Sequence, residues 1–372
     1  MAEWSRPVAT TIAEYITGAE DEFMRNRKLL KAMKARGRIK YNCSGSTFEW
    51  RVPYRRGNVV VNNGAQGITP TPVDRYKVAS LGWSGYVITD LMTKREQLMN
   101  RGKQAIIDYY EEMAGNIVED LTEKFAEDLY VDSSASGNSG KMSGIETCMA
   151  YTQTVTISSG AARSANAADV VAYPNDTYAG LSTVLGNYAG SWGTQSNISS
   201  TWPAGRGDDA YDFYSPTIVN YTSTAFGGSS ATWAVQCESA IRFMNDHLGR
   251  NKGSNIPDML MLDRDLYRLF KENYSPMQRV EVGSAQNEHS FGFKDSIDFE
   301  GLTVTSEYGI PTGVGYAFNL KNMELRSLQS KLFDTRGPKF DDLSNAWYVI
   351  VDNLGQMKFH SPRYFGKLAA VA

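Results

Sequence analysis

Cysteine and histidine, the residues that would mark a disulfide-rich or metal-binding protein, are scarce. The 372 residues contain three cysteines, Cys43, Cys148 and Cys237, an odd number with no two close together. This pattern argues against a disulfide framework or a zinc knuckle and favours separate thiols in a reducing cytoplasm. The three histidines also lie far apart, without the spacing of a metal-binding motif. We therefore expect no metal site and no cofactor.

The sequence also lacks an export signal, a membrane span and a strong net charge. Its first residues have no basic segment followed by an apolar one, as a signal peptide would. No apolar run approaches the roughly 20 residues that a membrane helix needs. The formal net charge is -3, so no overall field steers the chain toward nucleic acid or a membrane. We expect a protein made in a cytoplasm, with no membrane partner.

Catalytic motifs are missing as well. Gly140-Lys141 has some likeness to a phosphate-binding loop, but Ala135 stands where that motif needs its first glycine. Met142 stands where the motif needs serine or threonine, so we interpret the segment as a plain Ser/Gly loop. No G-x-S-x-G elbow is present. We predict that the protein is not an enzyme and has no catalytic residue.

What the sequence does contain is the composition of a large globular protein. It is 42% hydrophobic and 21% charged, and its length allows two or three domains with sizeable cores. The order of its patterns is strands, one long helix, and then mixed elements. That order favours the α+β class.

Residues 11–36 are typical of a helical arm with uneven charge. Eight basic residues and no acidic residue lie between Arg25 and Lys40. One interpretation is a solvated helix face, and the other is an arm that contacts an acidic partner or a polyphosphate. The candidate basic residues of the arm are Arg25, Arg27, Lys28, Lys31 and Lys34.

Residues 47–54 alternate strictly between apolar and polar, which predicts a strand with one buried face. A turn-rich tip follows, and a second β-rich stretch runs from about residue 76 to 89. Two strands alone are marginally stable in water, and nothing nearby supplies a third. We expect this flap to lie on something else, with another subunit as a natural candidate. The candidate contact residues of the flap are Arg55, Arg56, Asn62, Asn63, Gly64 and Gln66.

Residues 91–131 carry the strongest helical pattern, with apolar residues at three- and four-residue steps. At about 1.5 Å per residue, this helix would be about 60 Å long. Its charges oppose the helix dipole, since Lys94–Lys103 is basic and 111–128 is acidic. Neighbouring subunits could supply complementary charge, or the charges could simply be solvated. The candidate contacts here are Glu111, Glu112, Glu119, Asp120 and Glu123.

The remaining chain predicts β-rich structure with two helices. Residues 132–230 are rich in Ser, Gly, Thr and aromatic residues, which indicates loops and strands. Cys237, Ile241, Met244 and Leu248 share one face of a predicted helix. Residues 256–262 predict a buried strand, and Asp263 can cap the helix after it. Strands follow at 299–305 and 314–320, and the final segment predicts a hairpin that turns near 352–355.

This order of elements resembles the major capsid proteins of tailed bacteriophages, which share the Hong Kong 97 type of fold. Several stretches are similar to phage coat sequences, and the likeness covers nearly the whole chain. They are TYAGLSTVLGNYAG (177–190), YDFYSPTIVNYTS (211–223), IPDMLMLDRDLYRLF (256–270), FEGLTVTSEYGIP (299–311), GYAFNLKNMELRSL (315–328) and LGQMKFHSPRYFGKL (354–368).

The resemblance implies a layout for the chain. An N-terminal arm (1–40) would precede an extended β loop (41–90). A peripheral domain (91–170) would contain the spine helix (91–131), and an axial domain (171–325) would surround the symmetry axes. The C-terminal strands (326–372) would return to the peripheral domain.

The resemblance also implies function and partners. Copies of the chain would assemble through pentamers and hexamers into an icosahedral shell around phage double-stranded DNA, which they would contact without base specificity. Scaffolding and portal proteins would be further partners, and the virion, assembled in the host bacterial cytoplasm, would be the location. Only about 40 residues precede the flap, so we expect scaffolding to be a separate protein, or to be absent. The flap's one lysine, Lys77, lies away from the tip, so we expect no covalent crosslink to a neighbour's asparagine.

Two alternatives remain open at this point. An encapsulin-like nanocompartment shell would use the same fold without DNA and would need a cargo-binding inner surface. A secreted β-rich adhesin could explain the Tyr/Ser/Gly-rich middle, although the missing signal peptide counts against it.

Overall fold

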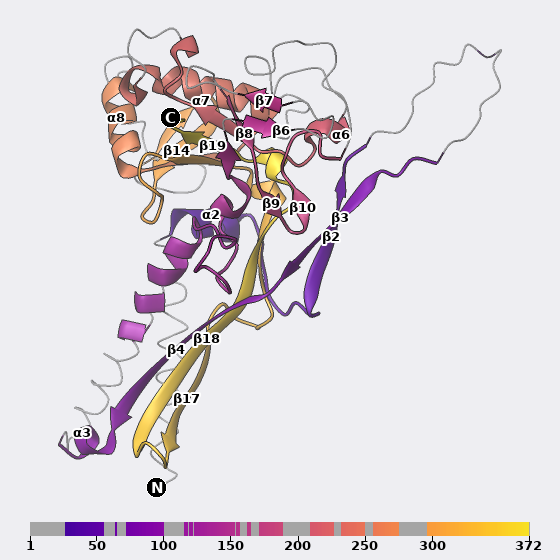
Figure 1. Ribbon diagram of the computed structural model, residues 1–372. Coiled ribbons are helices and arrows are strands. Elements are labelled where there is room, and N and C mark those ends of the chain that lie inside the picture. The colour runs from indigo at the N-terminus through magenta and orange to yellow at the C-terminus, as the bar shows by residue number, and fades with distance from the viewer. Residues whose placement is uncertain are drawn as a thin grey trace.

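A wide β-sheet, a long narrow sheet and a projecting two-stranded flap dominate the fold (Figure 1). The computed structural model describes residues 27–55, 64, 72–99, 115–117, 119–121, 123–152, 154–156, 162–164, 171–188, 209–226, 232–249, 256–274 and 296–371. Helices and strands are combined as the α+β prediction requires.

The wide sheet has eight strands in the order β13-β14-β12-β15-β19-β11-β8-β5. Helices α7 (Trp233–Gly249) and α8 (Arg264–Tyr274) pack against it. Its inner strands are almost entirely buried, as expected for a sheet covered on both faces. The strands are β5 (Tyr151–Thr152), β8 (Val171–Pro174), β11 (Thr217–Asn220), β12 (Met259–Leu262), β13 (Ile297–Phe299), β14 (Leu302–Ser306), β15 (Gly315–Phe318) and β19 (Gly366–Ala369).

The narrow sheet, which we call the peripheral sheet, is built on β18 (Ala346–Phe359). Along one edge β18 pairs first with β17 (Asp334–Asp341) and then with β16 (Met323–Ser327). Along its other edge it pairs with β4 (Ser84–Thr93) in antiparallel register. The short strand β1 (Ile39–Lys40) adds to β16 in parallel. Figure 1 shows β4, β17 and β18 running together away from the wide sheet.

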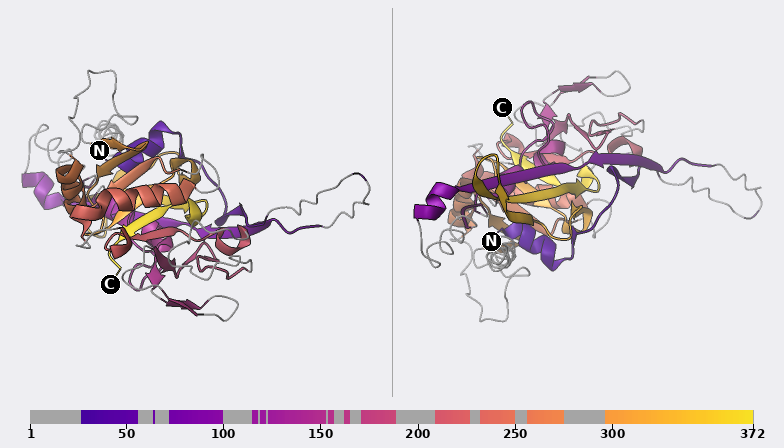
Figure 2. Two further views of the ribbon diagram at one scale, coloured as in Figure 1. Left: turned by 90° about the horizontal axis from the view of Figure 1, so that it is seen from above. Right: turned by 90° about the horizontal axis from the view of Figure 1, so that it is seen from below.

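The flap consists of β2 (Thr47–Pro53) and β3 (Tyr76–Gly82), and it projects sideways from the body (Figure 2). The predicted alternation of β2 is confirmed, because its residues are exposed and buried in strict turn. The second β-rich stretch divides in two at Trp83. Its first half, β3, stays in the flap, and its second half, β4, joins the peripheral sheet.

Several shorter elements complete the chain. Helix α2 (Lys28–Ala35) lies within the predicted arm and buries Leu29, Leu30, Ala32 and Met33. Residues 115–117, 119–121 and 123–128 are helical. The other elements are α3 (Lys94–Met99), η1 (Ile145–Cys148), β6 (Thr154–Thr156), β7 (Ala162–Ser164), β9 (Thr177–Tyr178), β10 (Leu181–Ser182), α6 (Asp209–Asp212), η2 (Thr224–Phe226), η4 (Leu320–Asn322) and η5 (Pro362–Tyr364).

Two large apolar cores hold most of these parts together. One lies between the wide sheet and its two helices, and it contains the predicted α7 face of Cys237, Ile241, Met244 and Leu248. The other joins α2, the flap, the helical residues Ile117, Leu121 and Phe125, and the peripheral sheet. Because the arm helix and the flap share this second core, both are integral parts of the subunit.

The predicted start of the long helix at residue 91 is wrong. Leu91 to Thr93 are the last residues of β4, and α3 begins only at Lys94. Thr93 and Glu96 form a capping box that fixes this start. The Glu96 carboxylate accepts from the Thr93 backbone N–H at 2.9 Å, and Thr93 Oγ1 accepts from the Glu96 N–H at 3.4 Å. Residues 100–114 of the prediction lie outside the described residues, and the helical run ends at Asp128.

Two expectations for the C-terminal region are also wrong. The hairpin turns at 342–345, where Asn345 adopts a positive φ of 47°, and β18 continues without a break through 352–355. In addition, not all C-terminal strands return to the peripheral sheet. Strand β19 lies inside the wide sheet, parallel to β11 and antiparallel to β15. Its four residues are all buried, which suits a central strand.

Candidate assembly surfaces

The base of the flap packs against the body of its own chain. Trp50, on the buried face of β2, donates from its indole Nε1 to the His360 carbonyl at 2.8 Å. Its ring also lies 6.3 Å from that of Tyr178, centroid to centroid. On β3, the Ser80 N–H donates to the Ala179 carbonyl at 3.0 Å. The base of the flap therefore does lie on something else, as expected, but this support is the body of its own chain and not the other subunit that was the natural candidate.

Two cations reinforce this packing. The Arg326 guanidinium lies 5.2 Å from the centre of the Phe48 ring, and the Lys358 ammonium lies 5.2 Å from that of Trp50. Both cations come from neighbouring strands of the peripheral sheet, β16 and β18. A cation over an aromatic face typically contributes about 0.5–2 kcal/mol, depending on desolvation. The flap base is thus held by apolar burial and by charge.

Glu324 is the carboxylate that these cations share. It binds Lys40 at 2.9 Å and Arg326 at 2.9 Å, and the Lys358 Nζ lies 3.6 Å away. Burial alone would raise the pKa of Glu324, but the hydrogen bonds from Lys40 and Arg326 and the charge of Lys358 hold it at about 2. This carboxylate is ionised throughout the physiological range. It joins the arm, the flap base and the peripheral sheet.

The predicted contact residues of the flap lie beyond this base. Arg55 is exposed, and its guanidinium lies 5.2 Å from the Tyr54 ring centre. Gly64 is exposed, with a positive φ of 88° that suits a turn. The other candidates, Arg56, Asn62, Asn63 and Gln66, lie outside the described residues. Among the described acidic candidates of the long helix, Glu119, Asp120 and Glu123, none forms an ion pair with Arg55.

The basic arm is less free than its sequence suggests. Lys28 donates to Thr305 Oγ1 at 2.6 Å, and the Arg27 guanidinium lies 5.5 Å from the Tyr308 ring centre. Lys31 is half-buried and Lys34 is exposed, while Arg25 lies outside the described residues. Lys28 and Arg27 are therefore engaged with the end of β14 and with the segment that follows it.

That segment contains Glu307, a carboxylate that the sequence analysis missed. Its Oε2 accepts from the Tyr130 hydroxyl at 2.8 Å and from the Leu29 N–H at 3.3 Å. Its Oε1 has no hydrogen-bond partner among the described residues. Burial raises the pKa of Glu307, although these hydrogen bonds and the charges of Arg27 and Lys28 oppose the rise. Glu307 connects the arm helix, the end of the long helix and the wide sheet.

The acidic candidates of the long helix form a short exposed stripe. Glu119, Asp120 and Glu123 are all exposed, and Glu123 accepts from the Tyr308 hydroxyl at 3.3 Å. Lys124 interrupts the stripe, since its Nζ lies 3.3 Å from Glu127 and 3.4 Å from Asp128. Glu111 and Glu112 lie outside the described residues. Part of the acidic charge is therefore neutralised within the subunit.

The outer face of the peripheral sheet is a surface that the sequence analysis did not anticipate. Val87 is 64% exposed and Leu91 is 54% exposed, although both lie in the middle of a paired strand. Leu354 on β18, opposite Gly85, is also exposed. In the sequence, these exposed residues alternate with the half-buried Tyr86 and Ile88, which indicates a strand. The sequence analysis placed this strand in the flap and not in a separate sheet. Contiguous exposed apolar residues commonly mark a binding surface.

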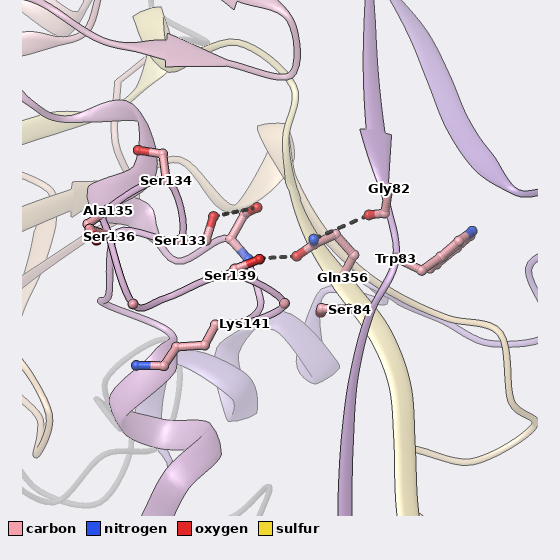
Figure 3. Close-up of a pocket in the computed structure, with 13 residues that line it drawn as sticks. Gly82, Trp83, Ser84, Ser133, Ser134, Ala135, Ser136, Ser139, Lys141 and Gln356 are labelled. Atoms are coloured by element: carbon pink, nitrogen blue, oxygen red, sulfur yellow. Dashed lines mark hydrogen bonds between the residues drawn. The ribbon is translucent and has the colours of Figure 1, made fainter.

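A pocket lies where the flap joins this sheet (Figure 3). It has a volume of about 460 Å³. Gly82, Trp83 and Ser84 line one side, and residues of the Ser/Gly loop (133–143) line the other. Gln356 braces the two sides, because its Oε1 accepts from the Ser143 N–H at 2.7 Å and its Nε2 donates to the Gly82 carbonyl at 3.2 Å. Within the loop, the Lys141 ammonium donates a hydrogen bond to Asn138 Oδ1 at 2.7 Å.

Within the described part of the chain, no three His, Cys, Asp or Glu side chains are grouped as metal ligands would be. His247 stacks on Phe243 with a centroid distance of 3.7 Å, and His289 lies outside the described residues. None of the described helices is long and apolar enough to span a membrane.

Comparison with known proteins gives results for structure but not for sequence. No family model matches the chain, and no curated protein matches it. The capsid of Cyanophage A-1(L) matches with a TM-score of 0.52 at 13% identity, over 90% of each chain. The capsid of a native GTA particle matches with a TM-score of 0.50 at 10% identity, over 91% of this chain and 90% of the other.

The chain has a phage-capsid fold. The resemblance inferred from the order of elements is therefore confirmed at the level of fold. The match extends over about nine tenths of each chain.

Proposed function

We propose that the protein is a major capsid subunit of a tailed bacteriophage. Copies of it assemble through pentamers and hexamers into an icosahedral shell that encloses double-stranded DNA. The observation that carries this proposal is the capsid fold, matched over about 90% of the chain by two phage-type capsids. The shell would belong to the virion and would be assembled in the host cytoplasm.

The exposed surfaces of the subunit support self-association. The flap projects from the body on a rigid base, so it can reach a neighbouring subunit without losing its own packing (Figure 2). The outer face of the peripheral sheet exposes Val87 and Leu91 to solvent in the isolated chain. Covering such residues at an interface is favourable by about 25 cal/mol for each Å² of apolar surface.

Charge adds a second kind of contact in this proposal. The exposed acidic stripe of Glu119, Asp120 and Glu123 would meet basic groups of a neighbour, with Arg55 and Arg56 of the flap as candidates. Each exposed pair contributes only about 0.2–1 kcal/mol, but a closed shell repeats the pair many times. In the same proposal, DNA is contacted through phosphates and without base-specific recognition. Scaffolding and portal proteins are further proposed partners.

Electron microscopy of the purified protein tests the proposal. Expression of the chain alone, and together with candidate scaffolding proteins, should give closed shells several hundred Å across. Soluble monomers under all of these conditions would contradict a shell function.

The nucleic-acid content of the particles separates the phage capsid from the nanocompartment of the same fold. Particles from infected cells should contain double-stranded DNA that survives external nuclease. Closed shells that contain a protein cargo and no DNA would instead favour the encapsulin-like alternative.

A further inference from the structure

The two outer edges of the peripheral sheet differ in how they are protected. Strand β17 at one edge contains Pro338, and its register shifts between Arg336 and Lys339. Proline, bulges and charges are the common means by which proteins keep an edge from pairing with another chain. Strand β4 at the opposite edge has no proline and no register shift, and no described strand pairs with its outer side.

Backbone contacts establish which groups of β4 face outward. Leu354 of β18 donates its N–H to Gln329 Oε1, and its carbonyl accepts from the Leu328 N–H, so both groups point away from β4. Gly85, which lies opposite Leu354, therefore also directs its N–H and carbonyl away from β18. The same orientation repeats at every second residue, at Val87, Thr89 and Leu91.

Part of this outward edge is closed by side chains of the subunit itself. The Leu91 N–H donates to the Asp90 carboxylate at 2.7 Å, and the Thr93 N–H donates to the Glu96 carboxylate at 2.9 Å. Gly85, Val87 and Thr89 have no such partner among the described residues. The open stretch is therefore a short run of three outward residues centred on Val87.

We propose that β4 of one subunit pairs with β4 of a second copy, antiparallel and related by a two-fold axis at Val87. In this register Val87 faces Val87 of the second copy, and Gly85 faces Thr89. Each facing pair can exchange both of its backbone hydrogen bonds, so all three open residues of each copy are satisfied. The contact is isologous, because the same patch is used on both sides.

The side chains of this stretch suit the pairing. Residues 85–89 carry no charge, so no like charges face each other across the axis. Val87 is 64% exposed in the single subunit and would be covered by its symmetry mate.

This inference rests on the proposed shell function, and a cysteine crosslink in assembled particles tests it separately. Val87→Cys is made in a Cys43→Ser background, since Cys148 and Cys237 are buried. Two Val87 residues in register would have Cα atoms about 5.5 Å apart. Leu91→Cys is the matched control, because it is exposed on the same strand, yet its two copies would be about 27 Å apart at about 3.4 Å per residue.

Particles are treated with a bis-maleimide too short to span the control separation and are then dissolved in denaturant. We expect most Val87→Cys chains to run as dimers and Leu91→Cys chains to remain monomers. Backbone hydrogen exchange of the unmodified chain gives an independent measurement, with slower exchange at the Val87 and Thr89 amides in shells than in free subunits.

The outcomes distinguish the two proposals. If the unmodified chain forms no particles, the shell function itself fails. If particles form but Val87→Cys chains stay monomeric, or Leu91→Cys chains crosslink instead, the β4 pairing is refuted and the shell function stands. If a variant does not assemble, unchanged exchange at Val87 and Thr89 in native shells refutes the pairing in the same way.

Discussion

Glu324 and Glu307 each attach an N-terminal segment to the body of the subunit, but their surroundings are opposite. Glu324, beneath the flap base, is shared by Lys40, Arg326 and Lys358, and its pKa is held at about 2. Glu307, beneath the arm helix, is more deeply buried, and its pKa is raised. In the first case direct cation contacts outweigh desolvation, and in the second desolvation outweighs the more distant charges.

The opposite pKa shifts of Glu324 and Glu307 predict which contacts of this subunit are sensitive to acid. A group with a lowered pKa stabilises the fold at neutral pH and loses that effect in acid. A group with a raised pKa has the reverse effect, because the folded state then favours the protonated form. The contacts of Glu324 beneath the flap base should therefore weaken in acid. The contacts of Glu307 beneath the arm helix should tolerate acid well.

The largest effect is expected when the flap base loses its central ring. Trp50→Ala removes a side chain that is 7% exposed, together with its hydrogen bond to His360. Such a change should lower the free energy of unfolding by about 3–5 kcal/mol, measured by denaturant titration. Arg51→Ala, on the exposed face of the same strand, is the control and should change it by less than about 0.5 kcal/mol. Equal effects of the two variants would show that the flap base is not packed as described.

Removing the charge of Glu324 should have the next largest effect. Glu324→Gln leaves the mostly buried Lys358 beside Arg326 without their shared carboxylate. We expect a loss of about 2 kcal/mol at pH 7, below the usual cost of breaking a fully buried pair because the site is partly solvated.

The pH dependence of Glu324 provides a sharper test. Because its folded pKa lies below the value of about 4.3 in an unfolded chain, its stabilisation is present above pH 4.3. It is then lost as the pH falls toward 2. The stability gap between wild type and Glu324→Gln should therefore close over this range. A gap that stays constant down to pH 2.5 would mean that the cations do not control this carboxylate.

Glu307 should respond in the opposite direction and more weakly. Glu307→Gln keeps an acceptor for Tyr130 and Leu29 but removes a buried charge, so we expect it to be at least as stable as wild type at pH 8. This advantage should shrink as the pH falls, because the wild-type carboxyl then takes up its proton. Glu307→Ala leaves both donors without an acceptor and should cost about 2 kcal/mol. Thermal unfolding from pH 4.5 to 8 measures the stability of wild type and both variants. If Glu307→Gln were less stable than wild type at pH 8, and most so at that pH, the raised pKa of Glu307 would be wrong.

The smallest effect per subunit is expected from the exposed charges. Arg55→Glu should leave the unfolding free energy nearly unchanged and yet raise the concentration needed for assembly, if the flap meets the acidic stripe of a neighbour. Adding Glu119→Lys should partly restore assembly, and salt should reduce both effects because screening acts over about 8–10 Å. Light scattering during assembly measures the concentration that each variant needs to assemble. Normal assembly of Arg55→Glu at low salt would show that this arginine is not the partner.

Local periodicity was sufficient to predict several parts of the fold. The alternation of residues 47–54 identified the buried face of β2, and the spacing of Cys237, Ile241, Met244 and Leu248 identified that of α7. These predictions succeeded because each pattern is decided by one buried face. The order of elements, more than any single motif, indicated the capsid fold.

The errors arose where one residue type serves two purposes. Gly355 was interpreted as a turn signal, but it lies within β18, where a side chain would approach the Arg326 carbonyl to 3.0 Å. It permits close packing of strands, and the turn is made instead at 342–345. Leu91 fitted a helical pattern equally well, and the capping box of Thr93 and Glu96 was the overlooked signal.

Long-range contacts were beyond sequence reasoning. Glu307 meets Leu29 and Tyr130 only because residues more than a hundred positions apart are folded together. The open edge of β4 likewise depends on which strand pairs with which side of β18. Neither feature has a local pattern that could have revealed it.

The place of β19 has a consequence for the timing of biosynthesis. This strand comes from the last residues of the chain, yet it lies between β15 and β11 and pairs with both. A ribosome that adds about 5–20 residues per second needs roughly 7–30 s to proceed from β11 to β19. Until then β11 and β15 each have an open edge, and the wide sheet is in two halves. A chain that stops before Gly366 lacks the strand that joins them, so the wide sheet cannot close until β19 has been made.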